Sequence, residues 1–176
     1  MKIVITAGHS NTDPGAVSGK DSESKLVTQF RNALRTCLLD LGIETVSDGT
    51  GELNLPLGDA IKLAKEAKFA LEIHMNASVN NTANGVETIA LPKDKTIAQK
   101  ISIAVAEGLG GLKIRGVNGW IDQSQSARGK LGYINAGGLI LELCFISNPT
   151  ELAKYKASYW AAARKLANVI AEHVGK

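Results

Sequence analysis

Gly138-Leu-Ile-Leu-Glu-Leu-Cys-Phe145 is the most apolar segment of the sequence. A continuous apolar run of this length predicts a strand that is buried on both faces, as in a parallel sheet. A helix is predicted to follow, because Asn148 is a good N-cap, Pro149 suits the first helical position and Glu151 at N3 is close to a capping box. We expect this helix to run to about Val174.

The same alternation of strand and helix continues upstream. Apolar residues recur every three or four positions in the predicted helices, whereas the predicted strands are short β-branched or apolar runs. This pattern predicts an α/β fold: one three-layer domain with a mostly parallel, twisted sheet of about six strands flanked by helices. The predicted strands upstream are 2–7, 43–46, 69–75 and 85–91, and the helices are 23–41, 57–68 and 94–109. The Gly-rich, polar stretch 108–132 is predicted to be a loop.

Composition bounds the class of protein. The 176 residues are 44% apolar and 21% charged, which is typical of one globular domain covering residues 1–176, with no second, separate domain expected. The net charge of +3 is spread along the chain, so we expect no nucleic-acid partner. No apolar stretch is long enough for a membrane span, and the N-terminal apolar run is shorter than that of a signal peptide. Cys37 and Cys144 suggest no disulfide framework, so we expect reduced thiols in a cytoplasmic protein.

Two histidines lie where ligands gather in parallel sheets, beyond or near the carboxyl ends of strands. His9 follows the first predicted strand, and His74 lies near the end of another. Alone, His9 is more often a turn residue than a metal ligand. Strand alternation gives His74 the same face as Glu72 and Asn76, so that side of the strand either meets solvent or lines a site.

Glu142 interrupts the apolar run quoted above. An unpaired carboxylate buried there is costly or stays protonated, and burial raises its pKa toward the range of a general base. An edge position or a pairing with an arginine would explain it without catalysis. We favour the functional interpretation.

Glu23 begins a predicted helix, where an acidic residue complements the helix dipole without any further role. A Gly-, Asp- and Ser-rich loop separates it from His9 and can fold back to bring the two together. Two histidines and a carboxylate are a plausible catalytic zinc set that leaves one position for water. Asp21 competes with Glu23 as the carboxylate ligand.

Four segments in this order resemble the zinc-dependent N-acetylmuramoyl-L-alanine amidases of the amidase-3 family, which are peptidoglycan hydrolases. The resemblance runs from residue 3 to beyond residue 150, with Ser10-Asn11 where the family often has Gly-Gly. The segments are Thr6-Ala-Gly-His-Ser-Asn-Thr-Asp-Pro-Gly-Ala16 with Glu23, Glu72-Ile-His-Met-Asn-Ala77, Asn84-Gly-Val-Glu-Thr88 and Leu139-Ile-Leu-Glu-Leu-Cys-Phe-Ile-Ser-Asn-Pro149.

The resemblance implies roles for single residues. It implies that His9, Glu23 and His74 bind Zn²⁺, that Glu142 is the catalytic glutamate and that Asn76 contacts substrate. The bond cut would be the amide between N-acetylmuramic acid and L-alanine of the stem peptide.

The expected setting is that of a monomeric phage or prophage endolysin, held in the bacterial cytoplasm until lysis and acting on peptidoglycan. A zinc peptidase cutting within the stem peptide and a non-catalytic wall-binding module are the alternatives. A nucleotide-binding protein is more distant, because the sequence has no phosphate-binding loop. Trp120 either packs under its loop or lines a substrate groove, and we expect Cys144 to be a buried thiol without a role.

Overall fold

A central β-sheet organises the protein, for which the computed structural model describes residues 2–126 and 129–176. Within those residues the sheet has five strands, in the order β1-β4-β7-β5-β6. They are β1 (Ile3–Ala7), β4 (Phe69–Asn76), β5 (Glu87–Ala90), β6 (Trp120–Asp122) and β7 (Leu139–Phe145). All neighbouring strands pair in parallel except β5 and β7, which are antiparallel. The predicted mostly parallel sheet is therefore confirmed.

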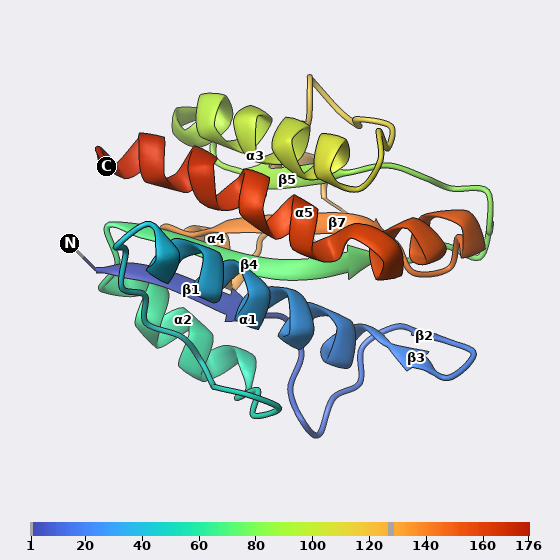
Figure 1. Cartoon of the computed structure of the whole chain (residues 1–176), viewed down its shortest axis with the longest axis horizontal. Coiled ribbons are helices and arrows are strands. Elements are labelled where there is room, and N and C mark those ends of the chain that lie inside the picture. The colour runs from blue at the N-terminus through green and yellow to red at the C-terminus, as the bar shows by residue number, and fades with distance from the viewer. Residues whose placement is uncertain (1, 127–128) are drawn as a thin grey trace.

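Helices cover both faces of the sheet and complete the three predicted layers. Figure 1 shows α5 between α1 and α3, and these helices pack on one face over the larger apolar core. The shorter α2 and α4 pack on the other face over a second, smaller core. The helices are α1 (Glu23–Asp40), α2 (Leu57–Lys65), α3 (Lys95–Gly108), α4 (Gly132–Asn135) and α5 (Pro149–Val174). A short hairpin of β2 (Val17–Ser18) and β3 (Asp21–Ser22) precedes α1, and the 3-10 turns η1 (Pro92–Asp94) and η2 (Gln123–Gln125) precede α3 and α4.

The predicted strand at 43–46 is wrong. Val46 makes only one parallel bridge, to Val4 of β1. The Arg35 side chain donates to the Thr45 carbonyl at 3.2 Å and to the Thr45 hydroxyl at 3.0 Å. Beyond the Val46 bridge, the Ala7 N–H donates to the Asp48 carboxylate rather than to a backbone carbonyl, and the Asp48 carbonyl accepts from the Leu55 N–H. The segment therefore contributes one bridging residue at the sheet edge rather than a sixth strand.

The prediction of an unbroken loop over 108–132 is also wrong in part. Trp120–Asp122 forms the edge strand β6 beside β5, with Trp120 opposite Thr88. A three-residue strand inside a Gly-rich stretch has too short an apolar pattern to be detected from the sequence. The helix α4 begins at the end of the same stretch and was not predicted either.

The start of α5 confirms the predicted N-cap but not the capping box. The Asn148 side chain accepts hydrogen bonds from the backbone N–H groups of Thr150 and Glu151. The Glu151 carboxylate does not return to Asn148. It is buried and accepts from the backbone N–H of Gly85 at 2.8 Å and of Phe145 at 2.9 Å. Glu151 therefore joins the loop before β5 to the end of β7.

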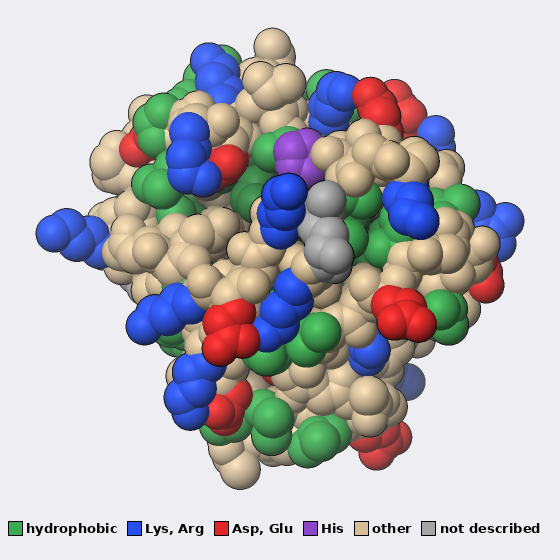
Figure 2. Space-filling model, turned by 90° about the vertical axis from the view of Figure 1, so that its left-hand side faces the viewer, with side chains coloured by type: hydrophobic (Ala, Val, Ile, Leu, Met, Phe, Trp, Pro, Cys, Tyr) green, Lys and Arg blue, Asp and Glu red, His purple; other side chains and the backbone are tan. Residues whose placement is uncertain are grey.

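The surface agrees with the even charge pattern of the sequence. On the side of the molecule where both chain ends lie, Lys and Arg side chains are interspersed with Asp and Glu (Figure 2). In the part of the chain that the structure describes, we find no helix with the length and apolarity to cross a bilayer.

Candidate metal and catalytic site

The carboxyl ends of β1 and β4 bring three predicted ligands together. His9 follows β1, His74 lies near the end of β4, and Glu23 is the first residue of α1. One ligand atom from each of the three residues lies within 4.8 Å of the others. The loop between His9 and Glu23 does fold back, so the predicted grouping is present in the structure. Two imidazoles and a carboxylate in this arrangement could hold a metal ion.

Glu23 lies at the centre of this cluster. Its Oε2 is 2.9 Å from His9 Nε2, and its Oε1 is 3.0 Å from His74 Nδ1. The same carboxylate accepts backbone hydrogen bonds from Met75 and Ala16. Burial raises the pKa of Glu23, but hydrogen bonds from His74 and His9 outweigh burial and hold that pKa well below its usual range. Glu23 is therefore an ionised carboxylate at neutral pH.

Each histidine has a second carboxylate at its outer nitrogen. His9 Nδ1 lies 3.0 Å from Asp13 Oδ2, and His74 Nε2 lies 3.2 Å from Glu72 Oε2. The hydrogen bond to Glu23 is the largest influence that raises the pKa of His9. Burial lowers the pKa of His74, yet Glu23 and Glu72 together raise it well above its ordinary value. An outer carboxylate that orients a histidine is the usual environment of a metal-binding imidazole.

Two glycines leave room for the imidazole rings. A Cβ on Gly8 would lie 2.2 Å from His74 Cε1, and a Cβ on Gly15 would lie 2.6 Å from His9 Cδ2. Gly15 also has a φ of +64°. His9 itself has a φ of 65°, a left-handed conformation that costs free energy in a non-glycine residue. The surrounding contacts must hold His9 in this conformation.

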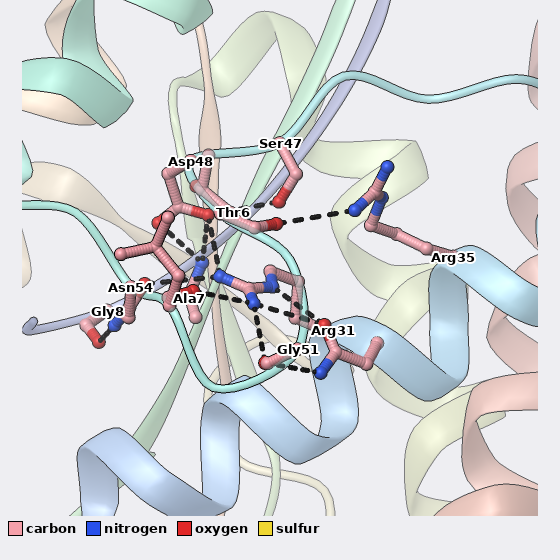
Figure 3. A network of polar contacts seen from close by, with 12 residues as sticks. Thr6, Ala7, Gly8, Arg31, Arg35, Ser47, Asp48, Gly51 and Asn54 are labelled. Atoms are coloured by element: carbon pink, nitrogen blue, oxygen red, sulfur yellow. Dashed lines mark hydrogen bonds and ion pairs between the residues drawn. The ribbon is translucent and has the colours of Figure 1, made fainter. Parts of the chain in front are cut away.

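A buried polar network holds the backbone just before His9 (Figure 3). The Asp48 carboxylate accepts from the Ala7 N–H at 3.2 Å and from Arg31 Nη1 at 3.2 Å. Asn54 donates from its side chain to the Gly8 carbonyl at 2.9 Å and accepts from Arg31. Burial raises the pKa of Asp48, and the positive charge of Arg31 opposes that rise. The two residues before His9 are thus each held by a side chain from a distant segment.

Sequence reasoning missed this network, although one signal for it was present. Arg31 occupies the apolar side of its helix, three or four residues from Val27 and Leu34, and it is fully buried. A charged residue on an apolar helix face implies a buried partner. Nothing in the sequence identified that partner as Asp48, which follows Ser47 and precedes Gly49 in what looks like an ordinary turn.

Glu142 lies beside the cluster in the sheet. It is opposite His74 in the parallel pair of β4 and β7, and opposite Glu87 in the antiparallel pair of β5 and β7. Its Oε2 is buried and has no hydrogen-bond partner among the described residues. Burial raises the pKa of Glu142 to about 7; His74 opposes the rise, and the carboxylates of Glu23 and Glu87 add to it. A carboxylate with this pKa is suited to accept a proton at neutral pH.

Asn76 is engaged within the protein. Its side-chain amide donates to Glu87 at 3.0 Å and accepts from the Ala77 N–H at 3.2 Å. Arg115 pairs with the other oxygen of Glu87 and lies over the Phe145 ring. The structure therefore gives Asn76 a clear role in holding Glu87, and contact with substrate stays a prediction.

The remaining candidates lie away from the cluster. Asp21, the competitor of Glu23, lies in the hairpin, pairs with Lys156 of α5 at 2.6 Å and is outside the cluster of His9, Glu23 and His74. Cys144 is fully buried in the larger core, and burial raises the pKa of its thiol. Trp120 donates to the Ala90 carbonyl at 3.1 Å and packs against the same core, which favours the packing interpretation.

Comparison with known proteins gives a consistent result. The family Amidase_3, described as N-acetylmuramoyl-L-alanine amidase, matches residues 3–175. The chain is 25% identical over 165 residues to N-acetylmuramoyl-L-alanine amidase LytC of Bacillus subtilis, a match that covers 90% of this chain and 32% of that protein. The chain thus spans about a third of the length of the curated relatives it matches.

Solved structures show the same fold. A Neisseria meningitidis protein assigned as an N-acetylmuramoyl-L-alanine amidase superposes with a TM-score of 0.90 at 43% identity, covering 99% of this chain and 96% of that chain. An N-acetylmuramoyl-L-alanine amidase from Clostridium difficile 630 superposes with a TM-score of 0.82 at 22% identity, covering 98% and 96% of the two chains. At that lower identity the likeness concerns the fold alone.

Proposed function

Because the chain belongs to the Amidase_3 family of N-acetylmuramoyl-L-alanine amidases, we propose that it hydrolyses peptidoglycan at the amide bond between N-acetylmuramic acid and L-alanine. The proposal includes a zinc ion bound by His9, Glu23 and His74. The observation that supports it best is the convergence of these three side chains beside a partly buried carboxylate with a pKa of about 7, that of Glu142.

The donor set fits zinc rather than a harder cation. Two imidazole nitrogens and one carboxylate are typical of catalytic zinc sites, whereas Mg²⁺ and Ca²⁺ prefer oxygen ligands alone. His9 would bind through Nε2 and His74 through Nδ1, since these nitrogens face Glu23. Bound zinc would supply Lewis acidity to the scissile carbonyl and lower the pKa of a water molecule.

Glu142 would act as the general base and then as the general acid. Its unpaired, buried Oε2 would accept a proton from the attacking water as the oxygen of that water adds to the carbonyl carbon. The same carboxyl would then give the proton to the departing nitrogen as the carbon–nitrogen bond breaks. The products would be a lactyl carboxylic acid on the glycan and a stem peptide with a free L-alanine amino group.

Digestion of purified peptidoglycan followed by mass spectrometry tests this function. We expect free stem peptides that begin at L-alanine, intact glycan strands and loss of both products when a chelator is present. Glu142→Gln is the matched control, because it keeps the metal ligands and removes the base. Cuts within the stem peptide would show that the protein is a zinc peptidase rather than an amidase. Stoichiometric zinc without any product would instead indicate a wall-binding module.

The proposed biological setting is that of a phage or prophage endolysin, active on the wall as a monomer after release from the host cytoplasm. Expression in the bacterial cytoplasm tests it. The expected result is continued growth until the membrane is permeabilised, followed by rapid lysis. Lysis or wall remodelling without permeabilisation would point to an exported autolysin. Light scattering of the purified protein tests whether it is a monomer in solution.

A further inference from the structure

We propose that Glu72 is a positioning residue, which fixes the His74 ring so that Nδ1 faces the metal position. The inference rests on the proposed zinc function. Glu72 precedes His74 by two residues on β4, and it is not one of the three residues of the candidate metal cluster.

The carboxylate of Glu72 is placed deep in the sheet. Its side chain is only 2% exposed, and its register partners are Thr6 of β1 and Ile140 of β7. A buried carboxylate is costly unless a cation or hydrogen-bond donor faces it. Among the described residues, the one ion pair of Glu72 is with His74 Nε2, at 3.2 Å. A carboxylate buried at this depth with a histidine as its charged partner is a specific arrangement rather than a solvated strand face.

The His74 ring has a carboxylate at each nitrogen and the Gly8 backbone packed against it. Nδ1 faces Glu23, Nε2 faces Glu72, and the backbone of Gly8 lies so close to the ring that no Cβ fits there. A half-turn of the ring would exchange Nδ1 with Cδ2 and Nε2 with Cε1. Both carboxylates would then face carbon atoms, so the pair of Glu23 and Glu72 selects one orientation of the ring.

Asp13 provides the matched comparison. It faces the outer nitrogen of His9, as Glu72 does for His74, but its side chain is 62% exposed. A hydrogen bond in that position competes with water and contributes little. We therefore expect the two outer carboxylates to differ: removing Glu72 should affect the metal site strongly, and removing Asp13 should affect it weakly.

Zinc affinity measured by chelator competition tests this difference on the full chain. For Glu72→Leu we expect a 10- to 100-fold loss of affinity relative to the wild type, as is typical when an outer-shell partner of a zinc-binding histidine is removed. Glu72→Gln should lose less, because its amide oxygen still accepts from Nε2–H. Asp13→Asn should stay within about threefold of the wild type, since its carboxylate is exposed.

Two further readouts separate positioning from folding and from direct ligation. In the metal-free protein, Glu72→Leu should change the melting temperature little, because it removes a buried carboxylate while His74 keeps its hydrogen bond with Glu23. The visible spectrum of the Co²⁺-substituted protein should keep its shape, since the ligands are unchanged. Nitrogen-15 NMR of the zinc-loaded wild type should show the His74 proton on Nε2, and the zinc affinity of Glu72→Gln keeps the test open even if Glu72→Leu fails to fold.

The outcomes distinguish the two levels of the proposal. Zinc affinity of Glu72→Leu equal to that of the wild type, or a His74 proton on Nδ1, would overturn the positioning role alone. A changed cobalt spectrum in Glu72→Gln would overturn it in favour of direct ligation. A wild type that takes up no zinc would instead overturn the proposed metal chemistry, and the role of Glu72 with it.

Discussion

His74 on β4 and Glu142 on β7 are register partners on adjacent parallel strands. Paired residues of neighbouring strands place their side chains on the same face of a sheet. The sheet itself therefore sets the proposed base beside a proposed metal ligand. Glu87 on β5 continues the row on the other side of Glu142. A chemical arrangement that involves residues far apart in the chain is thus fixed by strand register.

Glu142→Gln is predicted to reduce the rate of hydrolysis by about 10²- to 10⁴-fold, the usual contribution of general acid–base catalysis. Zinc content should stay at the wild-type level, because the substitution leaves His9, Glu23 and His74 in place. Single-turnover assays with a defined muropeptide, together with metal analysis of the same sample, measure both. Wild-type activity in this variant would exclude Glu142 from the mechanism.

The raised pKa of Glu142 also predicts a pH-dependent stability difference in the metal-free protein. The pKa is about 7 in the folded state against an ordinary value of 4.5, so the folded state binds the extra proton between these values. Wild-type stability contributed by this group therefore falls as the pH rises from about 4.5 to 7. Glu142→Gln should be more stable than the wild type by about 1–3 kcal/mol at pH 8 and equal to it at pH 4.

Thermal unfolding in the presence of a chelator, followed by circular dichroism at both pH values, checks this prediction. A wild type that matches the variant at pH 8 would show that Glu142 ionises without penalty.

His74→Ala is predicted to lose zinc and activity together. Loss of a ligand should weaken zinc binding by more than the roughly 100-fold that an outer-shell change can cause. His173→Ala is the matched control, because His173 lies in the last turn of α5 against Phe69 and outside the metal cluster. Isothermal titration with zinc measures both variants. Stoichiometric zinc in His74→Ala would remove this residue from the ligand set.

Gly8→Ala is predicted to displace the His74 ring. The new Cβ would overlap ring atoms, so we expect a destabilisation of about 1–3 kcal/mol, typical of overpacking, and weaker zinc binding. Gly58→Ala serves as the control, because a Cβ there meets no atom within 4 Å and Gly58 lies in α2. Urea unfolding and zinc titration should show a loss of stability and of zinc affinity in Gly8→Ala and neither loss in Gly58→Ala. Unchanged zinc affinity in Gly8→Ala would show that the ring can move without loss.

Arg31→Met is predicted to destabilise the protein by about 3–5 kcal/mol, because it leaves the buried Asp48 carboxylate without its cation. The double variant Arg31→Met, Asp48→Asn should recover part of this loss. Arg35→Met, which removes a partly exposed arginine on the same helix, should cost much less. Urea unfolding measures all three. Equal losses for Arg31→Met and Arg35→Met would show that the buried pair of Arg31 and Asp48 adds no more to the free energy of unfolding than a partly exposed arginine does.

The elements that could be predicted from the sequence are those with a regular local pattern of apolar residues. Apolar spacing located β1, β4, β7 and the long helices, because each buries a regular face or run. His9 and His74 were found because they lie at or near the ends of predicted strands, and Glu142 was found because it interrupts an apolar run. The placement of Glu23 needed the fold of a loop, and the sequence alone kept Asp21 as its competitor.

The parts that sequence reasoning missed depend on contacts between distant segments. Arg31 and Asp48 meet across a turn, and Glu151 leaves its own helix to bind backbone groups of Gly85 and Phe145. The segment ending at Val46 fails to extend as a strand because the Ala7 N–H binds the Asp48 side chain in place of a backbone carbonyl. Such partners are set by the tertiary structure, and no local period encodes them.

The position of β7 has a consequence for synthesis on the ribosome. β7 lies between β4 and β5, yet it is the last strand of the sheet in chain order. Until its residues have been translated, β4 and β5 each keep an unpaired edge, and non-local pairing of this kind forms late. A nascent chain that ends before residue 139 holds all three proposed metal ligands but lacks both the strand that unites the sheet and the glutamate proposed as the base. The strand that unites the sheet and the proposed catalytic base therefore arrive in the same seven residues.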